Sequence, residues 1–467
     1  MNLSGSRSRQ MVPFLILVLA LCFAACRQTD PPPSHITTDR EEIARQIQQV
    51  NDRELACWYP LCLDTVYGGY YSDFNYKWEL QGRQNKMIVT QARHIWSVSN
   101  AILHHQESPL MFRVAAHGTA FLEHTMWDSV YGGFYDQVDR KGVPHPDSGM
   151  IIKRAYGNAF AIYGLAACYQ ATHDSAALHL AQRTFDWLEE HSHDPQYGGY
   201  FQSMSREGTP YKEGLLRTPP KDQNSMIHML EAYTELYQVW PNQRVKLALE
   251  SLLRIVRDTL TNDRGYLRLF FKKDWTPILR TDPDFPRGPF AENLDHISFG
   301  HDVETSYLML EASHVLGIPH DTVTLQKAKK KVDYALANGY DTLRGGIFDG
   351  GREDPATGVV TIVLETKEWW EQVEALNSFL LMSRLFPNDE RNYYDKFCRQ
   401  WEYCKHYLID TVNGGWYWGG LDKAPNNVHS PKGTIWKADY HTTRAMFNCL
   451  EGLKPASSDS SGQSSHH

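Results

Sequence analysis

Residues able to accept and return protons stand near the starts of helices predicted in distant parts of the chain. His301 and His441 each follow a loop, and Glu304 comes one helical turn after His301. Imidazole titrates near neutrality, so two histidines that face one cavity could remove a proton and return it. We expect Glu304 to hold the His301 ring and raise its basicity. Arg93 could stabilise an anionic oxygen of an intermediate with its fixed positive charge.

Further polar and aromatic residues occupy the same position, the first turn of a predicted inner helix, in other parts of the chain. They are Tyr156, Asn224, His228, Trp369, Trp370, Glu374 and Trp436. The tryptophans offer flat faces on which sugar rings could stack. Each residue also has a purely structural interpretation. A single histidine such as His228 usually has its hydrogen bonds satisfied within a core, and Trp369 could serve only to pack the helices together. Their recurrence at the same place in successive units favours a shared cavity.

A glycine-glycine-aromatic signal repeats along the chain and organises the elements that carry these residues. Its copies begin at residues 68, 132, 198, 265, 345 and 414, of which the fourth is reduced to Gly265-Tyr266. An aspartate precedes most copies by four residues, as Asp64 precedes Gly68. This pattern predicts an Asp-led tight turn in which the glycines supply positive φ angles. Repetition at this spacing indicates a stacked or closed repeat architecture.

Apolar residues recur at three- and four-residue steps between the turns, which predicts two helices in each unit. One set has mixed charge and should be half exposed; it covers about residues 40–57, 110–126, 176–191, 243–258, 325–338 and 390–407. The other set combines small, aromatic and polar residues and should form an inner ring; it begins near residues 91, 153, 224, 301, 368 and 440. The fold class is therefore all-α. We predict an (α/α)6 barrel of six helix-pair repeats joined by short Gly-Gly-aromatic hairpin loops, over residues 38–454. An open superhelix is the alternative.

The N-terminal segment has the character of an export signal. Arg7 and Arg9 precede an apolar run from Met11 to Ala25 that is short for a membrane span. Residues 1–25 are predicted to be a lipoprotein signal peptide, with Cys26 as the lipidated first mature residue; plain secretion is the alternative. Residues 26–37 would be a tether and the Ser-rich residues 455–467 a disordered tail. We therefore expect an exported protein, lipid-anchored at the periplasm or cell surface of a bacterium.

Export would permit disulfide bonds among the remaining cysteines. Cys57 and Cys404 lie near the ends of the first and last outer helices, which are neighbours in a closed ring. A bond between them could close that ring, although buried free thiols are at least as plausible.

The charge and the motifs exclude several classes of partner. A net charge of −8 without a basic block argues against nucleic acid. No zinc-type cluster or phosphate-binding glycine loop is evident, and the His301/Glu304 pair has no second pair to complete a metal site. We predict a monomer or weak dimer that uses no metal and no cofactor.

Five segments, taken together, resemble the N-acylglucosamine 2-epimerase superfamily and within it the cellobiose 2-epimerase branch. They are Arg93–Trp96, Asn224–Glu231, Gly300–Glu304, Glu368–Glu374 and Trp436–His441, in family order over nearly the whole mature chain. The resemblance implies an (α/α)6 barrel and cofactor-independent epimerisation at C2 of a reducing-end aldose, between glucose and mannose configurations.

The resemblance also implies roles for individual residues. His301 and His441 match the two acid/base residues, and Glu304 matches the carboxylate that supports the first. Trp436 matches an aromatic that stacks on the second sugar of a disaccharide. The polar pocket positions are matched by Arg93, Tyr156, Asn224 and His228, and a further wall by Trp369.

Three features depart from the family pattern. Glu371 and Asp439 each stand where proline is usual, and residues from about Leu279 to Leu294 look inserted ahead of His301, over the pocket mouth. These departures leave the substrate open. A monosaccharide epimerase or a mannose–fructose isomerase is the nearest rival.

Other protein classes also fit parts of the sequence. A glycoside hydrolase on the same barrel would need two carboxylates, and its candidates are Asp147, Asp222, Glu304 and Asp439. A non-catalytic sugar-binding lipoprotein would explain the tryptophans and the anchor but not the two histidines.

Overall fold

The computed structural model describes residues 36–104, 108–146, 149–215, 218–282 and 295–455. The predicted signal peptide, Cys26, nearly all of the tether and of the C-terminal tail, and most of the expected insertion lie outside these residues, as does Asp147. No helix in the described part of the chain is long and apolar enough to cross a membrane.

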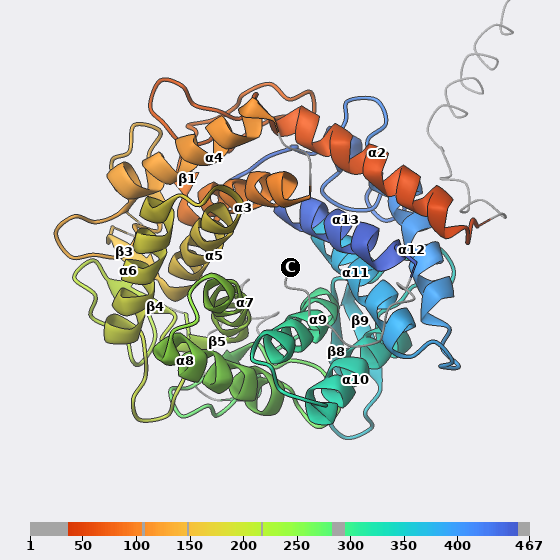
Figure 1. The fold of residues 1–467 in the computed structure, drawn as a ribbon. Helices are drawn as coiled ribbons and strands as arrows, with labels where there is room; N and C mark the ends of the chain where they lie inside the picture. The colour runs from red at the N-terminus through yellow and green to blue at the C-terminus, as the bar shows by residue number, and fades with distance from the viewer. Residues whose placement is uncertain (1–35, 105–107, 147–148, 216–217, 283–294, 456–467) are drawn as a thin grey trace, which may run out of the picture.

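Six helices form an inner ring around the molecular axis (Figure 1). They are α3 (Ile88–Leu103), α5 (Ala155–Thr172), α7 (Gln223–Val239), α9 (Phe299–Val315), α11 (Trp369–Leu385) and α13 (Tyr440–Leu453). Most of the residues of α5, α9 and α11 are buried, which explains why these three sequences mix small, aromatic and polar residues without a clear polar face. Each begins within three residues of its predicted start.

Six further helices form the outer layer (Figure 1). They are α2 (Arg40–Trp58), α4 (Pro109–Phe121), α6 (Ser175–His191), α8 (Gln243–Arg254), α10 (Thr322–Asn338) and α12 (Tyr393–Tyr407). Two of them continue into a wider π-helical turn, at Leu122–Met126 and Ile255–Leu260. Side-chain caps begin several of them; for example, Asp39 accepts hydrogen bonds from the backbone N–H groups of Glu41 and Glu42.

The inner ring is closed, because α13 contacts both α3 and the first outer helix, α2. The chain therefore returns to its own beginning, and the predicted (α/α)6 barrel is confirmed over the open superhelix. Hydrogen bonds from α3 hold the loop Thr434–Asp439, which leads into α13. The Thr90 hydroxyl donates to the carbonyl of Ile435, and the Arg93 guanidinium donates to that of Trp436 at 3.1 Å.

The glycine-glycine turns are hairpins with an aspartate at their head, as predicted. Asp64 Oδ1 accepts from the backbone N–H groups of Val66 and Tyr67, and Gly68 and Gly69 have φ angles of 81° and 67°. A Cβ on Gly69 would lie 2.6 Å from the Phe121 ring, so a side chain is excluded by contact as well as by φ. The reduced fourth copy uses Asn262 in place of the aspartate.

A buried lysine completes five of these turns, which the sequence analysis did not anticipate. Its ammonium group donates to the aspartate, and in four of the five also to the carbonyl of the first glycine. The pairs are Lys86–Asp64, Lys153–Asp128, Lys221–Asp194, Lys367–Asp341 and Lys432–Asp410. Lys153, although only three residues from Tyr156, is thus part of a turn and does not line the cavity described below.

Short strands connect the helices, a feature that the all-α prediction omits. They are β1 (Lys86–Met87) with β2 (Gln137–Val138), β3 (Ile152–Arg154) with β4 (Ser203–Ser205), β5 (Lys221–Asp222) with β6 (Phe270–Phe271), and the sheet of β7 (Ile297–Ser298), β8 (Gly350–Glu353) and β9 (Val360–Leu364). All pairs are antiparallel, and four of the strands lead directly into inner helices. They are too short for an alternating pattern to reveal them.

The cysteines of the described residues are all free thiols. Cys57 is half-buried against the turn at Gly414, whereas Cys404 is fully buried in α12. The two do not form the disulfide that their places in the ring suggested, and ring closure rests on packing and hydrogen bonds.

Candidate active site

The predicted site residues meet at one end of the barrel, around a cavity of about 270 Å³. The lining residues are Arg93, Tyr156, Asn224, His228, His301, Glu304, Glu368, Trp369, Trp370, Trp418, Trp436 and His441. Most lie in the first two turns of an inner helix, and all six inner helices contribute. The helix N-termini therefore converge on the cavity, which favours negative charge that develops there.

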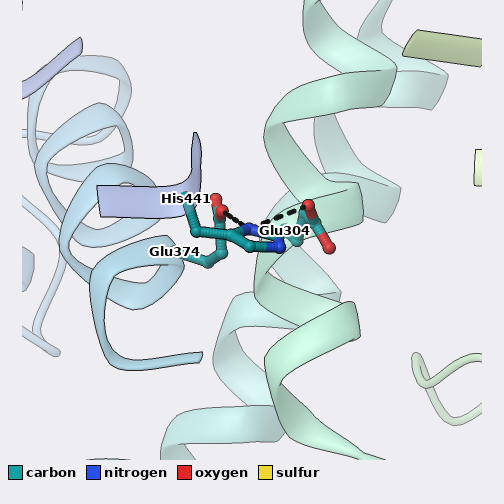
Figure 2. Close-up of side chains that lie close together, drawn as sticks. All are labelled: Glu304, Glu374 and His441. Atoms are coloured by element: carbon teal, nitrogen blue, oxygen red, sulfur yellow. Dashed lines mark hydrogen bonds and ion pairs between the residues drawn. The ribbon is translucent and has the colours of Figure 1, made fainter. Parts of the chain in front are cut away.

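His441 is held by a carboxylate. Its Nδ1 lies 2.6 Å from Glu374 Oε1 and 3.9 Å from Glu304 Oε1 (Figure 2). Glu374 is fully buried and touches the histidine from behind. Glu374 was predicted to contact substrate, but it does not line the cavity and supports the histidine instead. A carboxylate accepts from Nδ1–H and leaves Nε2 as the nitrogen available to a ligand.

Arg444 connects the acidic residues of the site and was not predicted. Its guanidinium donates to Glu304 at 2.5 Å and to Glu374 at 2.6 Å, and it also contacts Glu231 and the Tyr440 hydroxyl. Burial alone would raise the pKa of Glu231, but Arg444 and His228 hold that pKa at about 2. Burial likewise raises the pKa of Glu374, and Arg444 opposes this shift. Arg444 thus holds Glu231, Glu304 and Glu374 in place and favours the charged forms of Glu231 and Glu374.

His301 has a different partner from the one predicted. Its Nδ1 lies 2.8 Å from the hydroxyl oxygen of Ser298, and its ring packs on Trp370 with centroids 4.7 Å apart. Glu304, although one turn away in sequence, points toward Arg444 and His441. The i, i+3 spacing correctly placed both residues on one helix, but they do not bond to each other, because α13 supplies the partners of Glu304.

Both candidate acid/base histidines have depressed pKa values. Burial lowers the pKa of His301 well below 6.5, and the nearby His228 and Arg93 act in the same direction. Burial and then Arg93 lower the pKa of His441, and Glu304 partly opposes them. Both rings are therefore neutral near pH 7, the form in which an imidazole can accept a proton.

Arg93 and its neighbours form the polar wall of the cavity. The Arg93 guanidinium donates to the Tyr156 hydroxyl at 3.0 Å and packs over the ring of Phe160 at 4.4 Å. His228 Nδ1 lies 2.8 Å from Glu231 Oε2, so its ring is oriented by a carboxylate as well. These contacts fix a positive charge and several hydrogen-bonding groups at the cavity.

Four tryptophans also line the cavity: Trp369, Trp370, Trp418 and Trp436. Trp370 packs between the two histidines, 5.6 Å from His441 by ring centroids. Trp436 is 45% exposed, so its face is open to a ligand. Trp418 and Glu368 were not among the predicted site residues. The Glu368 carboxylate accepts from the indole N–H groups of Trp370 and Trp418 at 3.1 and 3.0 Å. Glu368 directly precedes Trp369, and that adjacency was the available signal.

One group of side chains has the composition of a metal site. Ligand-type atoms of Glu304, Glu374 and His441 lie within 4.8 Å of one another. Arg444, however, donates to both carboxylates with the same nitrogen, Nη2. A divalent ion bound there would lie beside a guanidinium charge, so this donor set does not favour a cation.

Of the carboxylates suggested for a hydrolase, the three that the structure describes, Asp222, Glu304 and Asp439, are not arranged as a pair across the cavity. Asp222 caps α7 through the Ser225 N–H, and burial raises the pKa of Asp222 to about 6. Asp439 is buried and accepts from the Tyr59 hydroxyl at 2.9 Å. Neither lines the cavity described above.

A larger cavity, of about 560 Å³, lies near the C-terminal ends of α9, α11 and α13. Its walls mix leucines, among them Leu310 and Leu380, with polar residues such as Glu311 and Arg384. It contains none of the predicted site residues, so the chemistry and not the volume identifies the smaller cavity as the candidate active site.

Several known proteins are similar to this chain in sequence. The family profile of N-acylglucosamine 2-epimerase (GlcNAc 2-epimerase) matches residues 69–445. A cellobiose 2-epimerase of Bacteroides fragilis is 30% identical over 421 residues, which cover 88% of this chain and 99% of that protein. A D-mannose isomerase of Marinomonas mediterranea is 24% identical over 408 residues, covering 86% and 95% of the two chains.

The chain is also similar to a solved structure. The cellobiose 2-epimerase of Spirochaeta thermophila superposes with a TM-score of 0.76 at 31% identity, over 90% of this chain and 99% of that one. The match of the family profile to most of the chain, together with these relatives, shows that the chain belongs to the N-acylglucosamine 2-epimerase family and is a carbohydrate 2-epimerase, an enzyme of the isomerase class.

Proposed function

We propose that this enzyme interconverts the glucose and mannose configurations at C2 of the reducing-end sugar of a β-linked disaccharide of the cellobiose or mannobiose type. The observation that supports this best is the pair His301 and His441, which come from different repeats and line one cavity. Each has Nδ1 engaged by another residue, so each can present Nε2 to a substrate.

The chemistry is a proton transfer in two steps. The bound sugar opens to its aldehyde form, and Nε2 of one histidine takes the proton from C2, leaving an enediolate. Arg93 offsets the negative charge on the enediolate oxygen, with help from the converging helix N-termini. After rotation about the C2–C3 bond, the other histidine delivers a proton to the opposite face of C2. One proton leaves C2 and one returns, so no redox partner or cofactor enters the balance.

The aromatic mouth supports a disaccharide over a monosaccharide. Trp436 lies half-exposed at the cavity, where its face can stack on a second sugar ring. Trp369 and Trp418 pack against each other at 4.7 Å between ring centroids and extend the wall. Several relatives are named for cellobiose.

The test is incubation of the purified protein in D2O with cellobiose, β-1,4-mannobiose, glucose and mannose separately, followed by NMR. Deuterium at C2, together with a new reducing end of the other configuration, is the expected result, with the disaccharides preferred. His301→Ala and His441→Ala should each abolish turnover with an unchanged circular dichroism spectrum. Release of monosaccharides from the disaccharides would instead indicate a hydrolase, and unchanged sugars would contradict the proposal.

A ketose isomerase is the second candidate, favoured by the similarity to a D-mannose isomerase. The same enediolate gives a ketose if the proton returns to C1 instead of C2. Formation of fructose from mannose in the NMR experiment would identify that activity.

We also propose that the protein is exported and anchored through Cys26. The support is in the sequence alone, where basic residues, a short apolar run and small residues precede this cysteine. Expression in a bacterial host with labelled palmitate should label the wild type and not the Cys26→Ser variant; equal labelling would contradict the anchor.

A further inference from the structure

Ser298 occupies a constrained position next to the cavity. It is the last residue of β7 and the N-cap residue of α9, and its backbone pairs with Gly350 of β8. Only 4% of its surface is exposed, and its hydroxyl oxygen lies 2.8 Å from Nδ1 of His301. The strand pairing fixes the serine, and the serine in turn fixes the histidine.

The two histidines therefore have chemically different partners. Nδ1 of His441 faces Glu374, an acceptor that Arg444 holds in place. Nδ1 of His301 faces a neutral hydroxyl, which can either donate or accept a hydrogen bond. A carboxylate stabilises an imidazolium more strongly than a hydroxyl does, so the two rings are unequal as acids and bases.

We propose that Ser298 is the positioning residue for His301, and that it accepts a hydrogen bond from Nδ1–H so that Nε2 remains directed at C2 of the substrate. This inference rests on the proposed function. Both forms of His301 that occur in the reaction carry a proton on Nδ1: the neutral ring that takes the C2 proton on Nε2, and the imidazolium that returns it. Ser298 keeps its own proton throughout.

The consequence is a selective dependence of one proton transfer on Ser298. Without the Ser298 hydroxyl, the His301 ring can rotate, or its proton can move to Nε2. A neutral ring that carries its proton on Nε2 cannot accept a second proton at that nitrogen. Transfers by His441 do not use Ser298 and continue. The loss of one such hydrogen bond should slow the His301 step by about tenfold.

The experiment compares wild type with Ser298→Ala in D2O, starting from each epimer of the preferred sugar. Two quantities are measured by NMR: deuterium at C2 of the recovered sugar and the amount of epimer formed. When the starting sugar is the epimer that His441 deprotonates, the impaired His301 protonates the enediolate slowly. His441 then more often returns deuterium to the original face. The ratio of deuterated recovered sugar to epimer should therefore rise about tenfold for this epimer and not for the other.

Three further variants make the result specific. Ser298→Cys keeps the shape with a weak acceptor and should resemble Ser298→Ala, while Ser298→Thr keeps the hydroxyl and should restore the wild-type ratios. Ser306→Ala is the matched control, because Ser306 is a buried serine of the same helix that bonds to Val303 and Ser378 and not to His301.

The outcomes separate this inference from the proposed function. Ratios that are unchanged in both directions, or raised in both, in the Ser298→Ala and Ser298→Cys variants would overturn the role of Ser298 alone. A wild type that places no deuterium at C2 and forms no epimer from any sugar would overturn the proposed function, and this inference with it.

Discussion

At the scale of single residues, the partners of the histidines decide their chemistry. His441 is supported by Glu374, and Glu374 by Arg444, so three side chains from α11 and α13 act as one unit. His301 is supported by the hydroxyl of Ser298. Substitution of a residue that never touches substrate should therefore alter turnover, and Arg444 is the clearest case.

Replacement of Arg444 by Met should damage both stability and activity. It would leave Glu231, Glu304 and Glu374 buried without their shared cation. Removing one partner from such a buried group costs about 3 kcal/mol or more, and the released glutamates would no longer hold His441. Urea unfolding and the epimerase assay measure the two effects. Arg384→Met, at an exposed arginine of α11, is the control, and equal effects of the two substitutions would contradict this role.

The pH dependence of activity should reflect the depressed histidine pKa values. Burial lowers the pKa of His301 and His441 well below 6.5, so the neutral proton-accepting forms persist below that pH. As pH falls, kcat/KM should remain on its plateau through pH 6.5 and decline only at lower pH, as each folded-state pKa is crossed. A steady-state pH profile measures this, and a decline centred at 6.5 or above would show that burial does not control the rings.

The same shifts affect stability with the same sign. A histidine whose pKa is lower in the folded state than in the unfolded state binds fewer protons when folded. The protein should lose stability as pH falls below 6.5 toward the folded-state pKa values.

At the scale of elements, each repeat is held by the turn that joins its outer helix to the next inner one. In five of these turns an Asp–Lys pair and two glycines set the angle at which the inner helix begins, and so place its first residues at the cavity; the turn at Gly265 uses Asn262 instead. Substrate-facing residues and turn residues are thus different side chains in the same segment.

Two lysine substitutions should differ in their cost. Lys221 lies 2.7 Å from Asp194 and provides the cation for that turn, so Lys221→Met should destabilise the fold by about 3 kcal/mol. Lys153→Met should cost less, because Arg206 also pairs with Asp128, at 3.0 Å. Denaturant unfolding of the two variants measures the difference, and a Lys153 variant that is the less stable of the two would contradict the argument.

Much of this arrangement follows from the sequence, and the omissions have physical causes. The glycine pairs and their aspartates predict the turns because only a few residues tolerate positive φ. Inner-helix starts follow from the turns, and with them the residues around the cavity. Arg444 could not be found this way, since its partners come from α7, α9 and α11 and only the closed ring brings them together. The pairing of Glu304 failed for the same reason.

At the scale of the whole molecule, closure makes the twelve helices of the described chain one structural unit. The first inner helix, α3, contacts the last, α13, and the loop before α13 is bonded to Thr90 and Arg93 of α3. Residues at both ends of the chain therefore contribute to the same cavity. Local unfolding of any one helix pair would expose the buried faces of the neighbouring pairs.

Unfolding should accordingly occur in one cooperative transition. Tryptophan fluorescence and far-ultraviolet circular dichroism, followed in the same urea titration, should give superimposable curves. Open repeat proteins can lose terminal repeats separately. Two separated transitions here would mean that the ring can open while most of it remains folded.

The cluster around Arg444 has a further consequence for how the enzyme handles charge. Three carboxylates, those of Glu231, Glu304 and Glu374, share the guanidinium of Arg444 at the centre of the barrel. Two imidazoles are bonded to these carboxylates, His441 to Glu374 and His228 to Glu231. In the proposed mechanism, the positive charge that forms on His441 when it takes a proton from the sugar would lie beside the Glu374 carboxylate, which Arg444 already holds in the fold.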